Sequence, residues 1–167
     1  MLDKLSRILM PLMLLGIFSH GTMAMGPAHF QGSPAQDSLT TTEHLIQFAA
    51  KQLHIPYRAG GSSLKGFDCS GFVRYCYQQF DILLPHSSAK QASHGDAVRL
   101  EDAKPGDLVF FKGQSTKSSI GHVGIITDIG PNSVRFIHAA FKGGIRYDLL
   151  QADYYRKRLV AIRRLVH

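Results

Sequence analysis

The sequence predicts an α+β fold in which N-terminal helices pack on a mainly antiparallel β-sheet of about five or six strands. Apolar residues recur at helical spacing between residues 40 and 95, whereas short β-branched and aromatic runs dominate after residue 107. Helices that come first and strands that follow are typical of α+β folds rather than alternating βαβ units. The 167 residues suit one domain and leave little room for a second.

The first expected helix begins at Thr40, because Thr40 and Glu43 have the spacing of a capping box. Apolar residues at helical spacing continue it to about His54, and Pro56 ends it. Residues 57–63 follow as a Gly- and Ser-rich loop.

A second helix is expected from Asp68 to Phe80, with an apolar stripe along one side. A short third helix is expected from about Ala89 to Gly95, and residues 104–107 form a turn. The strands are then expected at 107–112, 122–128, 133–139, 145–147 and 159–165.

The N-terminus has the pattern of a secretory signal. Lys4 and Arg7 precede an apolar run of 11 residues at 8–18, and small residues follow. We expect a signal peptide at 1–24, a flexible leader at 25–39 and one folded domain at 40–167. An uncleaved amphipathic anchor is the alternative. The expected location is the periplasm or cell envelope, or otherwise the secreted fraction.

The formal net charge of +7 favours an anionic partner: nucleic acid, an anionic membrane face or an anionic polymer. No nucleic-acid-binding module accompanies the charge, so nucleic acid is the weakest choice. Arg163 and Arg164 are expected to belong to a solvated basic edge, which could contact the anionic cell envelope.

Two cysteines lie seven residues apart in the second expected helix. Two helical turns separate their Cα atoms by about 10 Å, beyond the reach of a disulfide. Two free thiols are uncommon in an exported protein, and a catalytic cysteine would explain one of them. Cys69 is the candidate, and Cys76 is expected to be a small buried apolar residue.

Cys69 begins a helix, where free backbone amides and the helix dipole favour its thiolate. His122 and His138 lie in neighbouring expected strands, and a hairpin would bring them to one edge of the sheet. We therefore expect Cys69 as nucleophile, His122 as general base and His138 as the group that orients His122. A zinc site made of these three residues is the alternative, although no clustered ligand motif is present.

Six segments, in order, resemble the NlpC-type papain-like cysteine peptidases, and the resemblance covers roughly residues 40–165. The segments are 56–61, 67–72, 84–91, 104–111, 122–125 and 136–139. The resemblance implies a papain-like fold and a bacterial endopeptidase that acts on peptidoglycan stem peptides. In this family the bond typically joins γ-D-glutamate to a diamino acid.

Residue by residue, the resemblance gives Cys69, His122 and His138 the catalytic positions. It implies substrate contacts for Tyr57, Asp68 and Ser70 and requires no metal or organic cofactor. Two further functions stay open. One is an inactive module that binds peptidoglycan or a partner protein, and the other is an acyltransferase or broader amidase on the same fold.

Overall fold

A computed structural model describes residues 40–113 and 120–167. Both the expected signal peptide and the leader lie outside the described residues. The helices are α1 (Thr41–Ala50), α2 (Cys69–Gln78), α3 (Ser88–Gln91) and α4 (Asp153–Arg156), with a 3-10 turn η1 (Leu100–Asp102). The strands are β1 (Ser62–Ser63), β2 (Gly66–Phe67), β3 (Asp96–Val98), β4 (Leu108–Lys112), β5 (Ile120–Gly130), β6 (Ser133–Ala140), β7 (Gly144–Leu149) and β8 (Leu159–Arg164).

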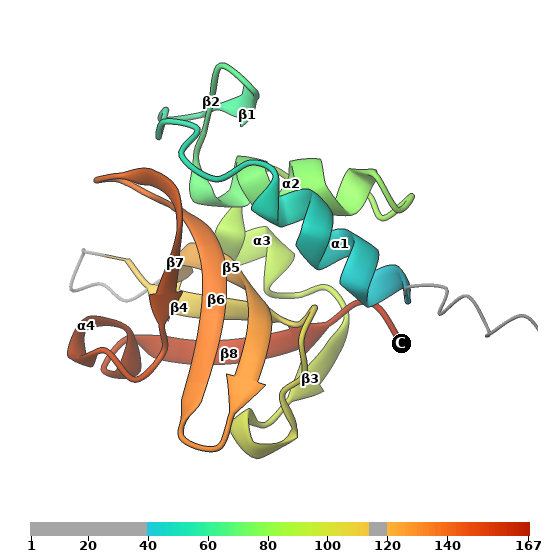
Figure 1. Cartoon of the computed structure of the whole chain (residues 1–167), viewed down its shortest axis with the longest axis vertical. Coiled ribbons are helices and arrows are strands. Elements are labelled where there is room, and N and C mark those ends of the chain that lie inside the picture. Colours follow the sequence, from blue (N-terminus) through green and yellow to red (C-terminus); the bar gives the residue numbers. More distant parts are fainter. Residues whose placement is uncertain (1–39, 114–119) are drawn as a thin grey trace, which may run out of the picture. The chain divides into compact units, whose positions relative to one another are not determined.

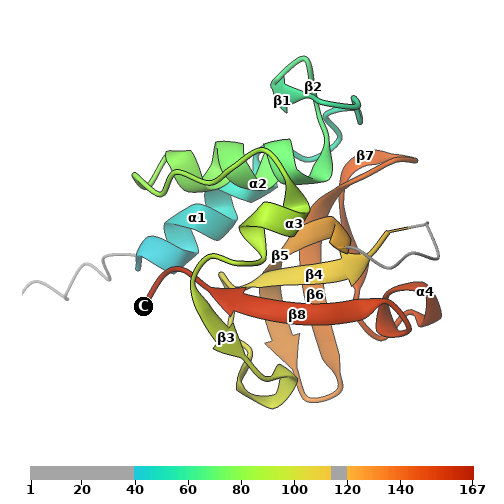
Figure 2. The same ribbon diagram turned by 180° about the vertical axis from the view of Figure 1, so that it is seen from behind.

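Six strands form one antiparallel sheet in the order β3-β8-β4-β5-β6-β7, and β1 and β2 form a separate small hairpin. Helices α2 and α3 lie against β5, and α1 lies alongside α2 (Figures 1 and 2). The α+β prediction and its strand number are confirmed.

The central strands are buried on both faces. In β4, Leu108 and Phe110 join the core with α1 and α2, whereas Val109 and Phe111 join a second apolar cluster with Ile126 and Phe136. Strands buried on both sides are continuously apolar rather than alternating, which explains the run at residues 108–111. Phe111 and Phe136 of this second cluster pack against the rings of His122 and His138, respectively.

The expected helices are longer than the observed ones. The capping box at Thr40 and Glu43 is present, but α1 ends at Ala50, because His54 has a φ of 70° and its N–H binds the Ile145 carbonyl. Helix α2 ends two residues before the expected Phe80. α3 covers only residues 88–91, ahead of the left-handed Gly95.

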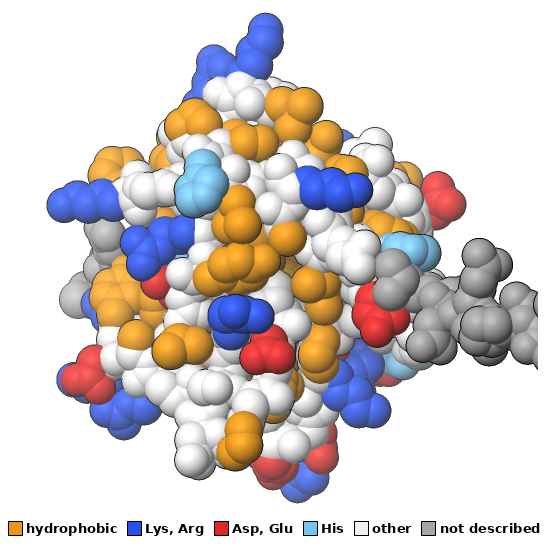
Figure 3. Space-filling view, viewed as in Figure 1, with side chains coloured by type: hydrophobic (Ala, Val, Ile, Leu, Met, Phe, Trp, Pro, Cys, Tyr) orange, Lys and Arg blue, Asp and Glu red, His pale blue; other side chains and the backbone are white. Residues whose placement is uncertain are grey.

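The expectation of a solvated basic edge is wrong for Arg164. Its guanidinium makes two hydrogen bonds of 2.8 Å to the carboxylate of Asp107, which is 1 % exposed, and thereby ties β8 to the start of β4. On the face shown in Figure 3, Lys and Arg side chains are scattered among Asp and Glu. No helix in the described part of the chain is long and apolar enough to cross a membrane.

Candidate active site

The first turn of α2 carries Cys69. Asp68 is the N-cap residue, and its carboxylate accepts hydrogen bonds from the backbone N–H of Gly71, at 2.7 Å, and from the Ser70 hydroxyl, at 3.0 Å. The first of these contacts satisfies a backbone amide that has no partner within the helix. Together the two contacts hold the first turn of α2 in place, and so set the direction in which the Cys69 side chain projects from the backbone.

A loop and an imidazole pack closely around this turn. The Nε2 atom of His86 lies 3.0 Å from each carboxylate oxygen of Asp68. A Cβ atom at Gly71 would lie 2.0 Å from the Gly61 carbonyl oxygen and 2.9 Å from His86 Nε2. Only glycine fits after the Asp-Cys-Ser sequence, because any side chain there would push the loop away from the turn.

The thiol faces an open cavity of about 670 Å³. Cys69 Sγ lies 4.0 Å from the carbonyl oxygen of Gly121, and the aromatic rings of Tyr57 and Phe141 meet edge to face nearby. The other lining residues come mainly from β5, β6, β7 and the segment around α4. They are Lys112, Gly113, His122, His138, Ala139, Ala140, Lys142, Arg146, Asp148, Tyr154 and Tyr155.

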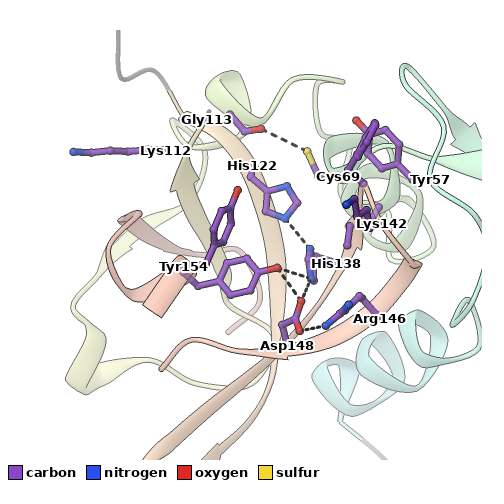
Figure 4. A pocket seen from close by; sticks show the side chains of 15 residues that line it. Tyr57, Cys69, Lys112, Gly113, His122, His138, Lys142, Arg146, Asp148 and Tyr154 are labelled. Atoms are coloured by element: carbon purple, nitrogen blue, oxygen red, sulfur yellow. Dashed lines mark hydrogen bonds and ion pairs between the residues drawn. The ribbon is translucent and has the colours of Figure 1, made fainter. Parts of the chain in front are cut away.

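His122 and His138 are hydrogen-bonded to each other, with 2.7 Å between His122 Nε2 and His138 Nδ1. Figure 4 shows the His122 ring between Cys69 and His138, so its other nitrogen, Nδ1, lies on the Cys69 side. Gly124 makes this contact possible, because a Cβ atom there would lie 2.6 Å from the Phe136 ring and 3.2 Å from His138 Cβ.

The chain of hydrogen bonds continues past His138. Its Nε2 atom lies 2.9 Å from a carboxylate oxygen of Asp148, and that oxygen also accepts a 2.8 Å hydrogen bond from the Tyr155 hydroxyl. Arg146 donates to the second oxygen of Asp148. Burial opposes ionisation of Asp148, but the hydrogen bonds from these three partners outweigh it and lower its pKa to about 2.

Burial favours the neutral form of both histidines. Burial, followed by the neighbouring His138, lowers the pKa of His122 to about 3, and burial also lowers the pKa of His138 against the opposing effect of Asp148. Burial and the negative charge of Asp68 raise the pKa of Cys69, although backbone amides oppose them. The backbone amides at the start of α2 thus act in the expected direction, towards the thiolate, but burial outweighs them.

The structure brings four of the six predicted site residues together at the cavity: Tyr57, Cys69, His122 and His138. Asp68 and Ser70 do not line it. They are bonded to each other behind Cys69, in the cap of α2. Within residues 40–113 and 120–167, no three His, Cys, Asp or Glu side chains are grouped in a way that would hold a metal ion.

The order and spacing of these residues match a known family. The model of the NlpC/P60 family matches residues 54–164, about two thirds of the chain. The chain belongs to the NlpC/P60 family. This confirms the resemblance and accounts for the papain-like placement of a cysteine at a helix start against histidines on the sheet.

Two curated relatives and one solved structure illustrate the likeness. The chain is 38% identical over 132 residues to the gamma-DL-glutamyl hydrolase of Bacillus subtilis (strain 168), covering 78% of this chain and 31% of that protein. It is 39% identical over 113 residues to the murein DD-endopeptidase MepS/murein LD-carboxypeptidase of Escherichia coli (strain K12), covering 67% and 56%. The chain thus spans less than two thirds of either relative.

The solved structure is that of an NlpC/P60 family protein from Bacillus cereus ATCC 10987. The two chains superpose with a TM-score of 0.70 at 30% sequence identity, over 77% of this chain and 41% of that one. The likeness confirms the predicted fold.

Sequence reasoning missed three polar residues of this NlpC/P60 site: Arg146, Asp148 and Tyr155. A signal was available for Asp148. It follows Arg146 by two residues along β7, and side chains two residues apart in a strand lie on the same face. Tyr155 comes from α4, a single helical turn that no periodicity in the sequence predicts.

Proposed function

We propose that this protein is a peptidoglycan hydrolase that cleaves amide bonds of stem peptides, with Cys69 as nucleophile, His122 as general base and His138 as a positioning residue. The observation that carries the proposal is the line from the Cys69 thiol through His122 to His138, which opens onto a cavity large enough for a peptide. Family membership supports the same chemistry.

In the first step the Cys69 sulfur attacks the amide carbonyl carbon, while the thiol proton moves to His122 Nδ1. The carbonyl oxygen takes up the negative charge, and the backbone N–H of Cys69 at the start of α2 is a candidate donor to it. The C–N bond then breaks, His122 gives the proton to the leaving amine, and a thioester remains on Cys69.

In the second step a water molecule loses a proton to His122 as its oxygen attacks the thioester carbonyl. The C–S bond breaks, the acid product leaves, and the proton returns to the Cys69 sulfur. The resting thiol and imidazole are both neutral, so the reaction cycle begins and ends with one proton on sulfur.

The cavity suits a substrate that carries carboxylates. Lys142 and Arg146 line it, whereas Asp148 is the one acidic side chain among the described lining residues and is itself bonded to Arg146. We propose the bond between γ-D-glutamate and a diamino acid as the one cleaved, because the α-carboxylate of a γ-linked D-glutamate is not used in the amide and stays free to meet these basic side chains. The relatives bear DL- and DD-specific names, so this choice needs a direct test.

Two further residues are proposed to contact the substrate, and a third to support one of them. Tyr57 lies on the cavity wall beside Cys69, while the Asp68 carboxylate is 16% exposed and is the candidate acceptor for a free amino end. Ser70 is proposed to assist by holding that carboxylate in place. Peptidoglycan is the proposed partner, and the site of action is proposed to lie outside the cytoplasm, in agreement with the expected signal peptide.

The test is to incubate the purified protein with defined muropeptides and to identify the cleaved bond by mass spectrometry. Cys69→Ser should abolish product release, whereas Cys76→Ala, which removes a thiol that is fully buried in the core, should keep it. Products in which an acyl group has moved to an added amine would instead favour a transferase. Full cleavage by Cys69→Ser would refute the nucleophile.

A further inference from the structure

Asp148 occupies the far end of the hydrogen-bonded line, away from the thiol. Its side chain is 17% exposed. Arg146 from its own strand and Tyr155 from α4 donate to it, and His138 from β6 lies within hydrogen-bond distance. The Tyr155 hydroxyl points its hydrogen at Asp148, at 2.8 Å, and lies farther from His138 Nε2, at 3.4 Å. Asp148 is therefore the acceptor that faces His138 Nε2.

These contacts determine where the protons lie. An ionised carboxylate can only accept, so the hydrogen between Asp148 and His138 belongs to His138 Nε2. A neutral His138 then has no hydrogen on Nδ1, and this nitrogen must accept. The hydrogen in the 2.7 Å contact between the rings therefore belongs to His122 Nε2, which leaves His122 Nδ1 as a bare lone pair on the Cys69 side.

We propose that Asp148 is a positioning residue that acts through His138 to hold His122 in the tautomer able to accept the Cys69 proton. The line beyond the thiol then has four members: His122, His138, Asp148 and the Tyr155 hydroxyl that orients Asp148. This inference rests on the proposed function, since it assigns a task within that reaction. It adds to the expected catalytic residues one carboxylate that acts through His138 rather than on the sulfur.

Arg146 determines how an amide at position 148 would be oriented. It can only donate, so the oxygen of Asp148 that it contacts must remain an acceptor. In Asp148→Asn the amide oxygen would face Arg146, and the amide NH₂ would face His138. His138 would then have to accept at Nε2 and carry its hydrogen on Nδ1. His122 in turn would carry its hydrogen on Nδ1, pointing at the thiol and unable to accept its proton.

Nitrogen-15 NMR of the histidine rings in the full chain at pH 7.5 tests this directly. In the unmodified protein, both His122 and His138 should carry hydrogen on Nε2. In Asp148→Asn both should carry it on Nδ1. A His122 ring that carries its hydrogen on Nδ1 in the unmodified protein would overturn the proposal, even if the variant failed to fold.

Kinetics with a cleavable muropeptide provide the second readout. Asp148→Asn should lower kcat by about 100-fold or more, with KM changed less than about threefold, because a wrong histidine tautomer blocks proton transfer but not binding. Asp148→Ala should lose less, because it does not impose the wrong tautomer, and Asp148→Glu should recover part of the rate. Equal rates for Asp148→Asn and the unmodified protein would overturn the proposal.

Asp153→Asn is the matched control. It removes the same charge from α4, where Asp153 is paired only with Arg156 and Lys157 on the helix surface among the described contacts. Its tautomers should match those of the unmodified protein, and its kcat should lie within about twofold. If no muropeptide is cleaved but the tautomers behave as expected, the proposed function fails and the proton arrangement stands. Cleavage with the opposite tautomers would overturn the proton arrangement and leave the proposed function intact.

Discussion

Adding one methyl group at Gly124 should separate the two histidines. The new Cβ atom would lie 2.6 Å from a Phe136 ring carbon, whereas ordinary contact begins near 3.4 Å, so the ring must move by about 0.8 Å. The His138 ring lies 4.9 Å from that of Phe136, and its own Cβ atom would be 3.2 Å from the new methyl group. Both displacements strain the 2.7 Å bond to His122.

We expect Gly124→Ala to cost about 1–3 kcal/mol of unfolding free energy through overpacking. A shift approaching about 1 Å at the histidines should lower kcat/KM for muropeptide cleavage by about 100-fold. Urea unfolding followed by circular dichroism measures the first quantity, and product formation followed by mass spectrometry measures the second.

Gly130→Ala is the control on the same strand. Its Cβ atom would meet only Ser133, with the hydroxyl oxygen at 2.9 Å, and that short side chain can rotate away. This variant should retain most of its stability and activity. If Gly124→Ala cleaved at the unmodified rate, the close approach of β5 and β6 would not be what sets the histidine contact.

Three further predictions concern charge. The raised pKa of Cys69 predicts that its alkylation by iodoacetamide keeps accelerating above pH 9, and a plateau near neutral pH would indicate a resting thiolate instead. Because the pKa of His122 falls from 6.5 to about 3 on folding, the unfolded chain binds more protons between these values. The free energy of unfolding, measured by urea titration, should therefore fall as pH drops from 6.5 to 3, by up to about 1.4 kcal/mol per pH unit for each such histidine, and a flat profile would contradict the burial. Lys142→Glu should raise KM for a carboxylate-bearing muropeptide by about tenfold at low salt and less at high salt. Lys90→Glu, at an exposed position of α3, should leave KM unchanged. Equal KM values for the two variants would remove Lys142 from the binding surface.

The sequence predicts those parts of the fold whose pattern is set locally. The capping box fixed the start of α1, and burial on both faces gave β4 its unbroken apolar run. The short strands carry no such pattern. β1 is two exposed serines, and β3 runs from Asp96 to Val98 at the edge of the sheet, paired only with β8. Their positions follow from tertiary pairing rather than from their own residues.

The site residues likewise divide into those that a local sequence pattern predicts and those that only the folded structure reveals. Cys69 was predictable because a cap residue and a following glycine mark a helix start, and the histidine contact followed from the pairing of neighbouring strands. The spacing along β7 could have placed Asp148 on the same face as Arg146, but it does not give its contact with His138. That contact depends on the register of β6 and β7, in which His138 pairs with Arg146. The direction of the Cys69 pKa shift also escaped prediction, since it depends on burial that only the folded chain creates.

The neutral resting state gives a reason for a free thiol in a protein proposed to act outside the cytoplasm. Oxidants and disulfides react with the thiolate, so a thiol whose pKa is raised by burial and by Asp68 reacts slowly with them. The raised pKa does not slow attack on the substrate in the same way, because His122 takes the thiol proton as the new carbon–sulfur bond forms. Cys76 is protected more simply, by complete burial in the core. The hydrogen-bonded line therefore holds His122 ready to accept the Cys69 proton during the reaction, and the sulfur can remain protonated at rest.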